Sequence, residues 1–542
     1  MEADRHSWRR DVLLVVILLL VGGTVKGWLL ARSQVLARDG VGYIQYAARL
    51  EREPIVQVLR TEQQHPLYPL SVLAAHRMTR PFTGDQPVSL HWQLSAQLAN
   101  LIAGVLLAVP MYLLGKELFD RRVGFWGALL FQVLPVPARV TADTLTEGTY
   151  LLWVAMALLF AIQGLRTRSL HWFMLAGLSG GLAYLVRPEG ALVIVLTGVV
   201  LLFMQVVRAW RMPWAQAAKC AISLGLAGAL TAAPYWYAIG GLTNKPSSLE
   251  FLKTLKGKLA SVSSTPELGD GLLLASRFSD GTDGIERNSV GPLFALYEVL
   301  DEVCKGFYYV TWIPVIGGLT WYRRRVASSP GLLLLLLVMA VSLLVLWQLA
   351  MKVHYVSERH TLLIVLCGSI LSVATLFHWS AQLSARSGMA LSPTWQKWLG
   401  HRRRWRLAFQ AGILALLAVG LIQTLKPLHK HRLGHKIVGL WLTCEMKPGD
   451  KFTDPYGLAS FYADQRLSPH PQPTDPAARK AAHRYLLVEP ADRDLHRCRQ
   501  IEHEKELMGA AEVVFAWPSA DHPELILYRS NKRRALSSGA TP

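Results

Sequence analysis

Long apolar stretches constrain the fold of this chain more than any other feature. A helix needs about 20 mostly apolar residues to cross a bilayer, and the sequence holds about eleven such stretches. They lie at residues 11–30, 91–114, 123–138, 149–164, 171–187, 190–207, 216–239, 303–321, 331–351, 360–379 and 406–425. With 52% hydrophobic and only 17% charged residues, the chain is too apolar for a string of soluble domains. We therefore predict a multi-span α-helical membrane protein.

Basic loops predict the orientation of these spans. The formal net charge is +20, from 57 Lys and Arg against 37 Asp and Glu, which by itself would also suit a nucleic-acid binder. With the N-terminus in the cytoplasm, every predicted cytoplasmic segment is basic, as the positive-inside rule requires. Topology then accounts for the charge, and no nucleic-acid partner is expected. The sequence has no Asn-x-Ser/Thr sequon, which favours a bacterial inner membrane over the eukaryotic secretory pathway.

Three larger segments face the outer side in this topology. Two are loops, at 31–90 and 241–302, and both belong to a predicted membrane domain over residues 1–425. The third, 426–542, contains the strand-like runs YLLVEP, AEVVFAW and ELILYR around the helical run DRDLHRCRQIEHEKELMG. This pattern predicts a small C-terminal soluble α/β domain on the outer side.

The cysteines give little guidance. The five cysteines form no CxxC or Cys/His spacing, so the sequence indicates neither a zinc site nor a redox motif. Cys444 and Cys498 both lie in the outer C-terminal segment, where a disulfide between them is an open alternative.

Ionisable and aromatic residues gather at the outer ends of the predicted spans, whereas mid-span positions are almost free of charge. This distribution argues against a transporter, whose substrate path crosses the bilayer. The outer group consists of Asp39, Tyr43, His65, Tyr68, Asp143, Glu147, Arg187, Glu189, Lys352, His354, Tyr355 and Arg359. Arginine and lysine neutralise phosphate, and a carboxylate takes a proton from an attacking hydroxyl. Such a set suits a substrate with a lipid tail and a phosphate head.

The stretch after Asp39 predicts a short helix along the membrane surface. Tyr43, Tyr46 and the following alanines recur at helical spacing, so the rings would lie at headgroup level and the small residues against the bundle. A carboxylate at the start of such a helix is held at one depth. Asp39 also precedes Gly40, however, and an Asp-Gly pair is typical of a simple turn.

Plainer explanations also exist for the other outer residues. Asp143 and Glu147 fit a solvated turn that caps the next helix. Arg187 fits a side chain that reaches water from a helix end. Arg359 fits a surface ion pair with a neighbouring glutamate, worth about 0–1 kcal/mol, and His65 fits a helix cap. The sequence alone leaves these alternatives open.

The chain resembles the GT-C superfamily of membrane glycosyltransferases through five motifs in the same order. These are DGVGYIQYAARL, HPLYPL, GKELFDRRVGFWGALLFQVLPVPARVTADTLTEGTYLL, GLSGGLAYLVRPEG and HYVSERHTLLIVL. Within the superfamily, the dolichyl-phosphate-mannose protein mannosyltransferases and the lipid A aminoarabinose transferases are the most similar. The resemblance covers roughly residues 10–380.

This resemblance implies an inverting transfer of a sugar from a polyprenyl-phosphate donor to an acceptor hydroxyl at the outer membrane face. Asp39 would be the catalytic base. Arg187, Arg359 and Lys352 would bind the donor phosphate. The remaining outer residues would position the substrates: Tyr43, His65, Tyr68, Asp143, Glu147, Glu189, His354 and Tyr355.

One departure from the family and two other functions stay open. The relatives have Asp-Glu where this chain has Asp39-Gly40, so the role of their second carboxylate cannot be carried over to this chain. Dependence on a divalent metal therefore stays open, and no other cofactor is implied. The acceptor is a protein, a lipid or a glycan. The alternatives are an O-antigen-ligase-like transferase that uses a diphosphate-linked glycan, and a lipid transporter or flippase.

Overall fold

The computed structural model describes residues 2–245, 291–386 and 411–530, apart from positions 83, 85, 208–209, 354, 413–414, 416–417, 448, 466 and 468–482. Within them, seven helical segments are long and apolar enough to cross a membrane. They are Trp8–Arg32, Val88–Leu118, Glu147–Thr167, Pro188–Val206, Trp214–Ile239, Pro330–Lys352 and Glu358–Gln382. The prediction of a multi-span helical protein is confirmed.

The bundle is built from long helices with shorter ones at its ends. The bundle helices are α1 (Glu2–Arg32), α5 (Val88–Leu106), α6 (Ala108–Leu118), α7 (Arg121–Val133), α9 (Glu147–Thr167), α10 (Leu170–Val186), α11 (Ala191–Val206), α12 (Trp214–Ile239), α17 (Pro330–Val353) and α18 (Leu362–Arg386). The short elements are α2 (Arg38–Arg52), α3 (Ile55–Thr61), α4 (Leu67–Thr79), η1 (Arg80–Phe82), α8 (Pro135–Val140), η2 (Pro188–Gly190), α14 (Pro292–Gly306), α15 (Ile313–Gly317), α16 (Leu319–Val326) and η4 (Glu358–Thr361).

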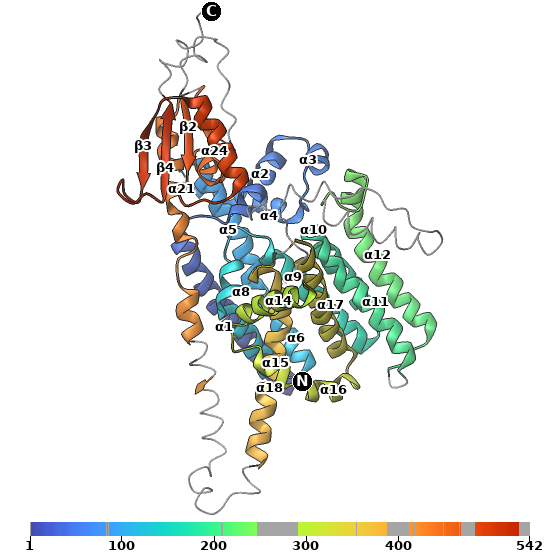
Figure 1. Ribbon diagram of the computed structural model, residues 1–542. Coiled ribbons are helices and arrows are strands. Elements are labelled where there is room, and N and C mark those ends of the chain that lie inside the picture. The colour runs from blue at the N-terminus through green and yellow to red at the C-terminus, as the bar shows by residue number, and fades with distance from the viewer. Residues whose placement is uncertain are drawn as a thin grey trace, which may run out of the picture.

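The two ends of the bundle differ. Figure 1 shows α2, α3 and α4 at the end that also carries the C-terminal sheet, whereas the N-terminus and α16 lie at the opposite end. Because α16 contains the arginine run 323–325, the basic end and the end with the sheet are separated by the length of the bundle.

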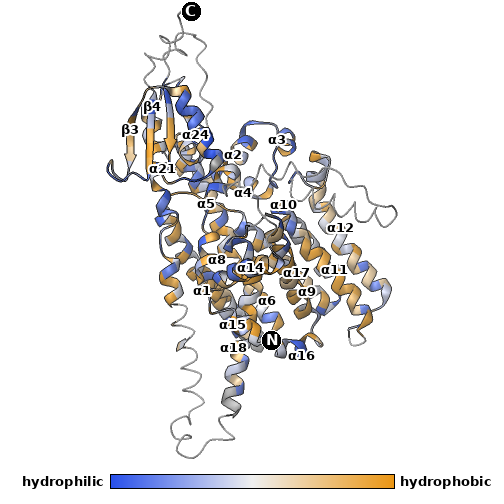
Figure 2. Cartoon of the chain, viewed as in Figure 1, coloured by the Kyte–Doolittle hydropathy of each residue, from blue (hydrophilic) through white to orange (hydrophobic). Residues whose placement is uncertain are grey.

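Small residues and apolar outer faces explain how these helices pack. Gly177 of α10 lies against the carbonyl oxygen of Leu224 in α12, where an added Cβ would be 2.1 Å from that oxygen. Such close approach is typical of membrane helices. On the outside, Leu202 of α11 and Leu226 and Leu230 of α12 are exposed, and Figure 2 shows hydrophobic colouring along both helices. These faces suit contact with lipid rather than water.

One predicted span is broken. We expected a continuous helix over residues 303–321, but α14 ends at Gly306 and only the short helices α15 and α16 follow. Tyr308 and Tyr309 adopt left-handed backbone angles, with φ of 51° and 59°, which a continuing right-handed helix does not contain. Pro314 also lies in this stretch and lacks the backbone N–H of a helix interior. The last predicted span, 406–425, lies largely outside the described residues.

Lys26 is a polar exception within α1. Its side chain is fully buried and donates a hydrogen bond to Oε1 of Gln132 in α7. Gln132 in turn donates through Nε2 to the carbonyl oxygen of Gly104 in α5, at 2.9 Å. Buried polar groups need hydrogen-bond partners in an apolar interior. These two bonds supply such partners and join α1, α5 and α7.

The C-terminal region contains a four-stranded sheet in the order β1-β2-β4-β3. Its elements are η5 (Lys430–Arg432), α21 (Leu433–Glu445), β1 (Lys451–Thr453), α22 (Leu458–Tyr462), β2 (Arg484–Val488), α24 (Leu495–Met508), β3 (Ala511–Trp517) and β4 (Leu525–Ser530). Strand β1 pairs with β2 in parallel, and the other pairs are antiparallel. The predicted α/β character is confirmed, with β1 as an addition.

Alternating side chains of β2 explain why helices cover both faces of the sheet. Tyr485 and Leu487 pack into one apolar cluster with residues of α21 and α22, while Leu486 and Val488 pack with Ile501 and other residues of α24. This is the period of two expected of a strand buried on both sides. Each layer therefore has its own core.

Hydrogen bonds fasten the C-terminal region to the bundle. The Tyr462 hydroxyl donates to Oε1 of Gln93 in α5 at 2.8 Å and accepts the backbone N–H of Leu36 at 3.1 Å. The backbone N–H of Ser89 donates to Asp464 at 2.9 Å. The segment that leads into α2 is thereby fastened to the C-terminal region through Tyr462.

The disulfide considered from the sequence is absent. Cys444 is exposed, Cys498 is half-buried, and both are free thiols. The sulfur of Cys498 instead lies 3.6 Å from the carbonyl oxygen of Asp492.

Candidate active site

Asp39 lies in the first turn of α2, where a carboxylate is favoured by the helix dipole. It does not cap the helix: the N-cap residue is Ala37, and no side chain caps this end. The following Gly40 packs so tightly against Thr144 that an added Cβ would be 2.1 Å from the Thr144 hydroxyl oxygen. The Asp-Gly pair therefore reflects close packing inside a helix rather than a turn.

The carboxylate of Asp39 forms an ion pair with Arg359, through Oδ2 and Nη1. Arg359 belongs to η4, the turn that leads into α18. A capping box between Ser357 and His360 fixes the start of η4. Both partners remain accessible, with 45% of the Asp39 side chain and 31% of the Arg359 side chain exposed. The plain explanation of Arg359 was an ion pair with a neighbouring glutamate. The partner is instead Asp39, 320 residues away in the sequence.

A second pair lies beside the first. Arg187, at the C-terminal end of α10, donates from Nη1 to Oε1 of Glu147 at 3.1 Å, and its guanidinium carbon lies 5.5 Å from the ring centre of Tyr150. Glu147 begins α9, and its side chain is only 5% exposed. Its other oxygen, Oε2, is buried and has no hydrogen-bond partner among the described residues. The buried carboxylate therefore has one oxygen unused.

Tyr43 feels the charges of both pairs. Burial, followed by the charge of Glu147, raises the pKa of the Tyr43 hydroxyl to about 12; Asp39 acts in the same direction, while Arg187 and Arg359 oppose it. Four charged groups from α2, α9, α10 and η4 thus act electrostatically on one hydroxyl. The structure brings together five predicted site residues that are far apart in the sequence.

Glu189 and Lys245 extend this cluster. Glu189 lies 3.7 Å from Nε of Arg187, and its other oxygen is 3.2 Å from Nζ of Lys245. Lys245 follows α12, and sequence reasoning missed it because nothing in its neighbourhood marks it as different from other loop lysines. We refer below to Asp39, Tyr43, Glu147, Arg187, Glu189, Lys245 and Arg359 as the charged cluster.

A metal site is not evident in this part of the molecule. Among the described residues, no three His, Cys, Asp or Glu side chains are grouped as metal ligands. In the charged cluster, arginine and lysine side chains form ion pairs with the carboxylates.

Comparison with solved structures decides the fold. The structure of ArnT from Cupriavidus metallidurans bound to undecaprenyl phosphate superposes with a TM-score of 0.54 at 14% identity, covering 98% of this chain and 99% of that one. The chain has a GT-C fold. The resemblance seen in the sequence motifs is confirmed at this level. A family model described as dolichyl-phosphate-mannose-protein mannosyltransferase also matches residues 89–234.

Other GT-C structures are more distant. The Archaeoglobus fulgidus oligosaccharyltransferase AglB, in complex with an inhibitory peptide and a dolichol-phosphate, matches with a TM-score of 0.45 at 15% identity, over 86% of this chain and 60% of that one. The Saccharomyces cerevisiae Pmt1-Pmt2 complex bound to the sugar donor matches with a TM-score of 0.33 at 14% identity, over 42% and 33%. No curated protein sequence matches the chain.

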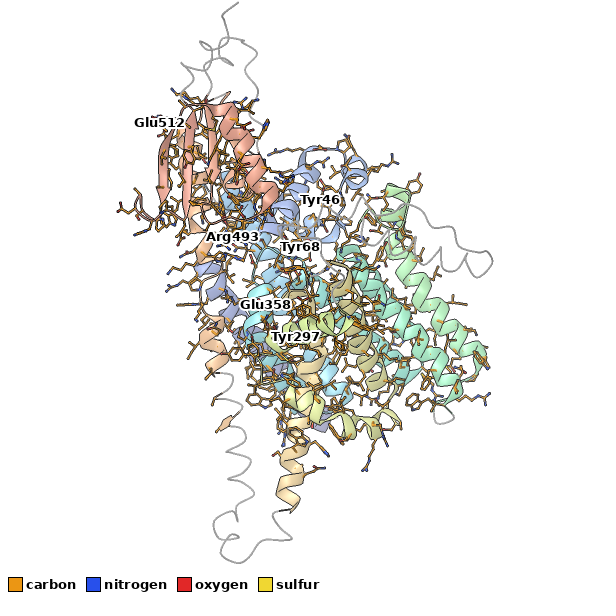
Figure 3. The ribbon with its side chains drawn as sticks, in the orientation of Figure 1. Tyr46, Tyr68, Tyr297, Glu358, Arg493 and Glu512 are labelled. Carbon is orange, nitrogen blue, oxygen red and sulfur yellow. The ribbon has the colours of Figure 1, made fainter. Side chains whose placement is uncertain are left out.

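Three residues that we predicted to position substrates form hydrogen bonds with the protein. His65 is buried, with its ring nitrogens 2.6 Å from the carbonyl oxygen of Tyr184 and 3.0 Å from the hydroxyl of Thr243. Burial lowers the pKa of His65 to about 4. The hydroxyl of Tyr68, which is labelled in Figure 3, donates to a backbone carbonyl in α5 at 3.2 Å, and the side chain is fully buried. Both residues support the GT-C scaffold from within.

Asp143 is the third. Its Oδ1 accepts the backbone N–H groups of Ala37 and Thr144, at 3.2 and 2.7 Å. Its Oδ2 lies 2.6 Å from Nε2 of His429. The solvated turn expected here is therefore a buried junction, and it fixes the chain immediately before α2. His429, which sequence reasoning missed, supplies the third contact.

The remaining predicted residues lie at the end of α17. Lys352 and Tyr355 are exposed, and Lys352 has no ion-pair partner in the part of the chain that the structure describes. His354 lies outside the described residues. The structure does not bring Lys352 or Tyr355 into contact with the charged cluster.

Proposed function

We propose that this protein is a membrane glycosyltransferase that moves a sugar from a polyprenyl-phosphate donor to an acceptor hydroxyl, with inversion at the anomeric carbon. The charged cluster carries this proposal, because it sets an accessible carboxylate beside two guanidinium groups at one end of an apolar bundle. The GT-C fold supports it, since the ArnT structure of that fold holds undecaprenyl phosphate.

The proposed mechanism divides the work between the two pairs. Asp39 accepts the proton of the acceptor hydroxyl as that oxygen attacks the anomeric carbon. The bond from the anomeric carbon to the phosphate oxygen breaks, and its electron pair stays on the departing polyprenyl phosphate. Arg359 and Arg187 stabilise the charge that develops there, which in a water-poor site is a large contribution. Attack from the face opposite the leaving group inverts the configuration.

Glu147 and Glu189 act on Arg187 rather than on the substrate in this scheme. Each carboxylate contacts one edge of its guanidinium, at 3.1 and 3.7 Å, so the side chain is oriented before the phosphate arrives. The donor phosphate would compete with Asp39 for Arg359. When the phosphate pairs with Arg359, the Asp39 carboxylate is released and can accept the proton of the acceptor hydroxyl. Tyr43 would contact the sugar between the two pairs, and Lys352 would meet the phosphate from the rim.

We further propose that the cluster faces the periplasm of a bacterial cell, with the N-terminus in the cytoplasm. The support is the separation of the basic α16 end from the end that carries α2 and the sheet (Figure 1), combined with the positive-inside rule. Residues 1–425 would then be the catalytic membrane domain, and 426–542 an extracytoplasmic domain.

The decisive experiment supplies purified protein in lipid nanodiscs with labelled polyprenyl-phosphate sugars and a cell-envelope extract as acceptor. Wild type should transfer label, and Asp39→Asn should lose it. Asp521→Asn, which changes an exposed aspartate of the C-terminal region, is the matched control and should match wild type. Equal transfer by Asp39→Asn would exclude the assigned base. Transfer only from polyprenyl-diphosphate glycans would favour the ligase-like alternative instead.

A further inference from the structure

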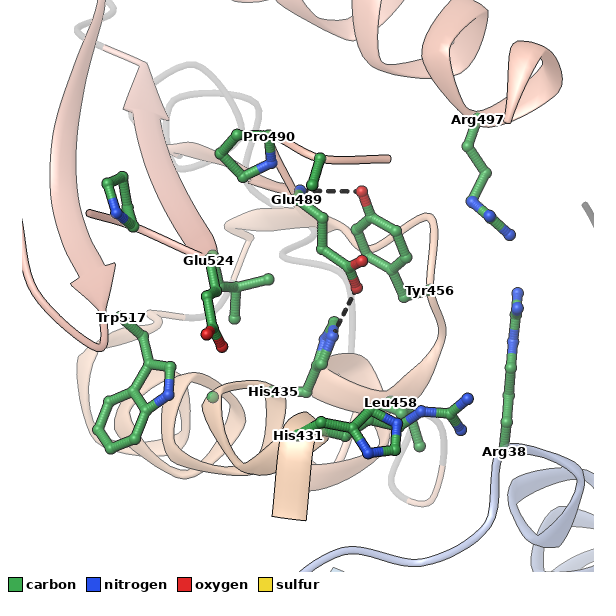
Figure 4. Close-up of a pocket in the computed structure, with 15 residues that line it drawn as sticks. Arg38, His431, His435, Tyr456, Leu458, Glu489, Pro490, Arg497, Trp517 and Glu524 are labelled. Carbon is green, nitrogen blue, oxygen red and sulfur yellow. Dashed lines mark hydrogen bonds and ion pairs between the residues drawn. The ribbon is translucent and has the colours of Figure 1, made fainter. Parts of the chain in front are cut away.

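A pocket with hydrogen-bond acceptors on its wall lies where the C-terminal region meets the first turn of α2. Its volume is about 460 Å³, and its lining comes from η5, α21, the α22 segment, the loop after β2, α24, the β3–β4 connection and Arg38 (Figure 4). None of the lining residues belongs to the charged cluster. Arg38 directly precedes the proposed base, Asp39, so the pocket borders the candidate active site without being part of it.

His435 of α21 has one polar atom that the protein does not use. The residue is 6% exposed, and its Nε2 lies 2.8 Å from Oε1 of Glu489. A carboxylate accepts hydrogen bonds, so Nε2 carries the proton and Nδ1 of the uncharged ring is an acceptor. Nδ1 is buried without a hydrogen-bond partner among the described residues. Because buried polar atoms are normally paired, this nitrogen indicates a ligand or an ordered water that donates to it.

Two carboxylates add further acceptors to the same wall. Glu489 follows β2, and its backbone N–H donates to the Tyr456 hydroxyl at 2.9 Å. Glu524 precedes β4, and its backbone N–H donates to the carbonyl oxygen of Trp517 at 2.6 Å. Both side chains line the pocket (Figure 4). Together with His435 they present three acceptors, which suits a ligand with several hydroxyl groups.

Trp517 gives the pocket an aromatic wall. An added Cβ at Gly434 would lie 2.7 Å from the indole, so the ring packs directly on α21 because Gly434 has no side chain. The same ring lines the pocket and offers apolar surface to the ring of a ligand. An aromatic wall with a few convergent polar groups is typical of a small-molecule site.

The arginines of the pocket do not decide the class of ligand. Arg38 and Arg497 line it, but both already interact with other groups of the protein. Asp492, for example, accepts hydrogen bonds from Nε and Nη2 of Arg497, at 2.7 and 3.0 Å. A guanidinium group that is paired in this way does not call for an anionic ligand. The ligand class therefore follows from the acceptors and the indole.

We propose that this pocket binds an uncharged sugar unit of the acceptor, which makes the acceptor a glycan. The sugar ring lies against Trp517, and its hydroxyl groups donate to His435, Glu489 and Glu524. The glycan continues past Arg38 to Asp39, where another of its hydroxyl groups reacts. This inference rests on the proposed transfer reaction, because it makes the pocket the place where that reaction holds its acceptor.

Binding is tested first, without donor, on the full-length protein in a detergent that has no sugar headgroup. The probes are galactose, mannose, N-acetylglucosamine and maltose, with glycerol as a probe that has hydroxyl groups but no ring. Titrations followed by saturation-transfer NMR should show contact with at least one sugar and none with glycerol, because only a ring can pack on the indole. If no sugar binds, Nδ1 of His435 is paired with water and the proposal is overturned.

Variants locate the bound sugar. Trp517→Ala and Glu524→Ala should each weaken its binding about tenfold, since each removes one contact. Glu506→Ala, which changes an exposed glutamate of α24 outside the pocket, is the matched control and should bind as wild type. Glu524 is exposed, so its variant keeps the test valid if Trp517→Ala lowers the thermal unfolding midpoint. Wild-type affinity in both pocket variants excludes this site.

Transfer kinetics then test the role of the pocket in the reaction. With the cell-envelope extract as titrated acceptor, Trp517→Ala and Glu524→Ala should raise the half-saturating amount of extract about tenfold and leave the maximal rate within about twofold of wild type. An unchanged half-saturating amount in both variants overturns the acceptor role. Failure of the proposed function is a separate result, because full activity of Asp39→Asn would refute the base while sugar binding and half-saturation stay measurable.

Discussion

Asp39 and Asp143 lie close together at the same end of the bundle, yet their surroundings differ. The Asp39 side chain is 45% exposed and has one ionic partner, Arg359. The Asp143 side chain is 5% exposed, and its two oxygens are held by two backbone N–H groups and by His429. A carboxylate with one accessible partner can exchange that partner for substrate. One that is enclosed by three contacts serves the fold, because losing them leaves buried groups unpaired.

The largest expected effect tests this contrast directly. Asp39→Asn should lower the rate of sugar transfer by about 10²–10⁴-fold, the usual loss when a general base is removed, with no change in thermal unfolding. Asp143→Asn should show the opposite pattern, with a lower unfolding midpoint and a transfer rate per folded molecule within a few-fold of wild type. Rates and differential scanning fluorimetry on the same samples measure both quantities. A stable Asp143→Asn enzyme without activity would break the comparison.

The next effect concerns the ion pair of Arg187 with Glu147. Arg187 is partly exposed, as Asp39 is, whereas Glu147 is buried, as Asp143 is. Arg187→Gln should reduce transfer by about 10²–10³-fold by removing a phosphate contact, and should also destabilise the protein because it leaves Glu147 buried without its partner. The double variant Arg187→Gln/Glu147→Gln should regain stability but not transfer. Recovery of both would show that Arg187 serves only as the partner of Glu147.

Local patterns explain what the sequence could predict. Runs of apolar residues placed most spans, and the strand-like runs YLLVEP, AEVVFAW and ELILYR placed β2, β3 and β4, because these signals lie within one element. Counting spans and basic loops also grouped five residues that the folded chain brings together, because that argument needs no tertiary contacts. The predicted span over 303–321 was wrong because hydrophobicity alone does not register the backbone angles of Tyr308 and Tyr309 or the effect of Pro314.

The division of labour among the outer residues could not be predicted in this way. Asp143 is enclosed by His429, 286 residues away, and His65 by Thr243, 178 residues away. Lys245 joins the charged cluster through Glu189. The residue type is the same for an exposed carboxylate such as Asp39 and a buried one such as Asp143, and only the folded chain determines which partners surround each one.

Gly40 offers a smaller effect that sharpens the same comparison, because it joins Asp39 to the Asp143 segment. A Cβ at this position would lie 2.1 Å from the hydroxyl oxygen and 2.8 Å from the carbonyl oxygen of Thr144. Gly40→Ala should therefore cost about 1–3 kcal/mol through overpacking and should lower transfer by displacing Asp39. Gly42→Ala, in the same helix with no atom within 4 Å of the added Cβ, is the matched control. Equal unfolding midpoints for the two variants would disprove the close packing.

The smallest effect is a pH dependence of stability from His65, another enclosed residue. Its pKa is about 4 in the folded protein, below the value of about 6.5 for an unfolded chain. As pH falls below 6.5, the unfolded state takes up a proton that the folded state does not bind until near pH 4, so stability is lost in this window. Between pH 7.5 and 5.5 the loss from His65 should be about 1 kcal/mol. Unfolding midpoints at the two pH values measure it, and His65→Gln should reduce the difference. It should not abolish the difference, because burial also lowers the pKa of His76 to about 4. An unchanged difference in His65→Gln would mean that His65 is accessible to water and belongs with Asp39 rather than with Asp143.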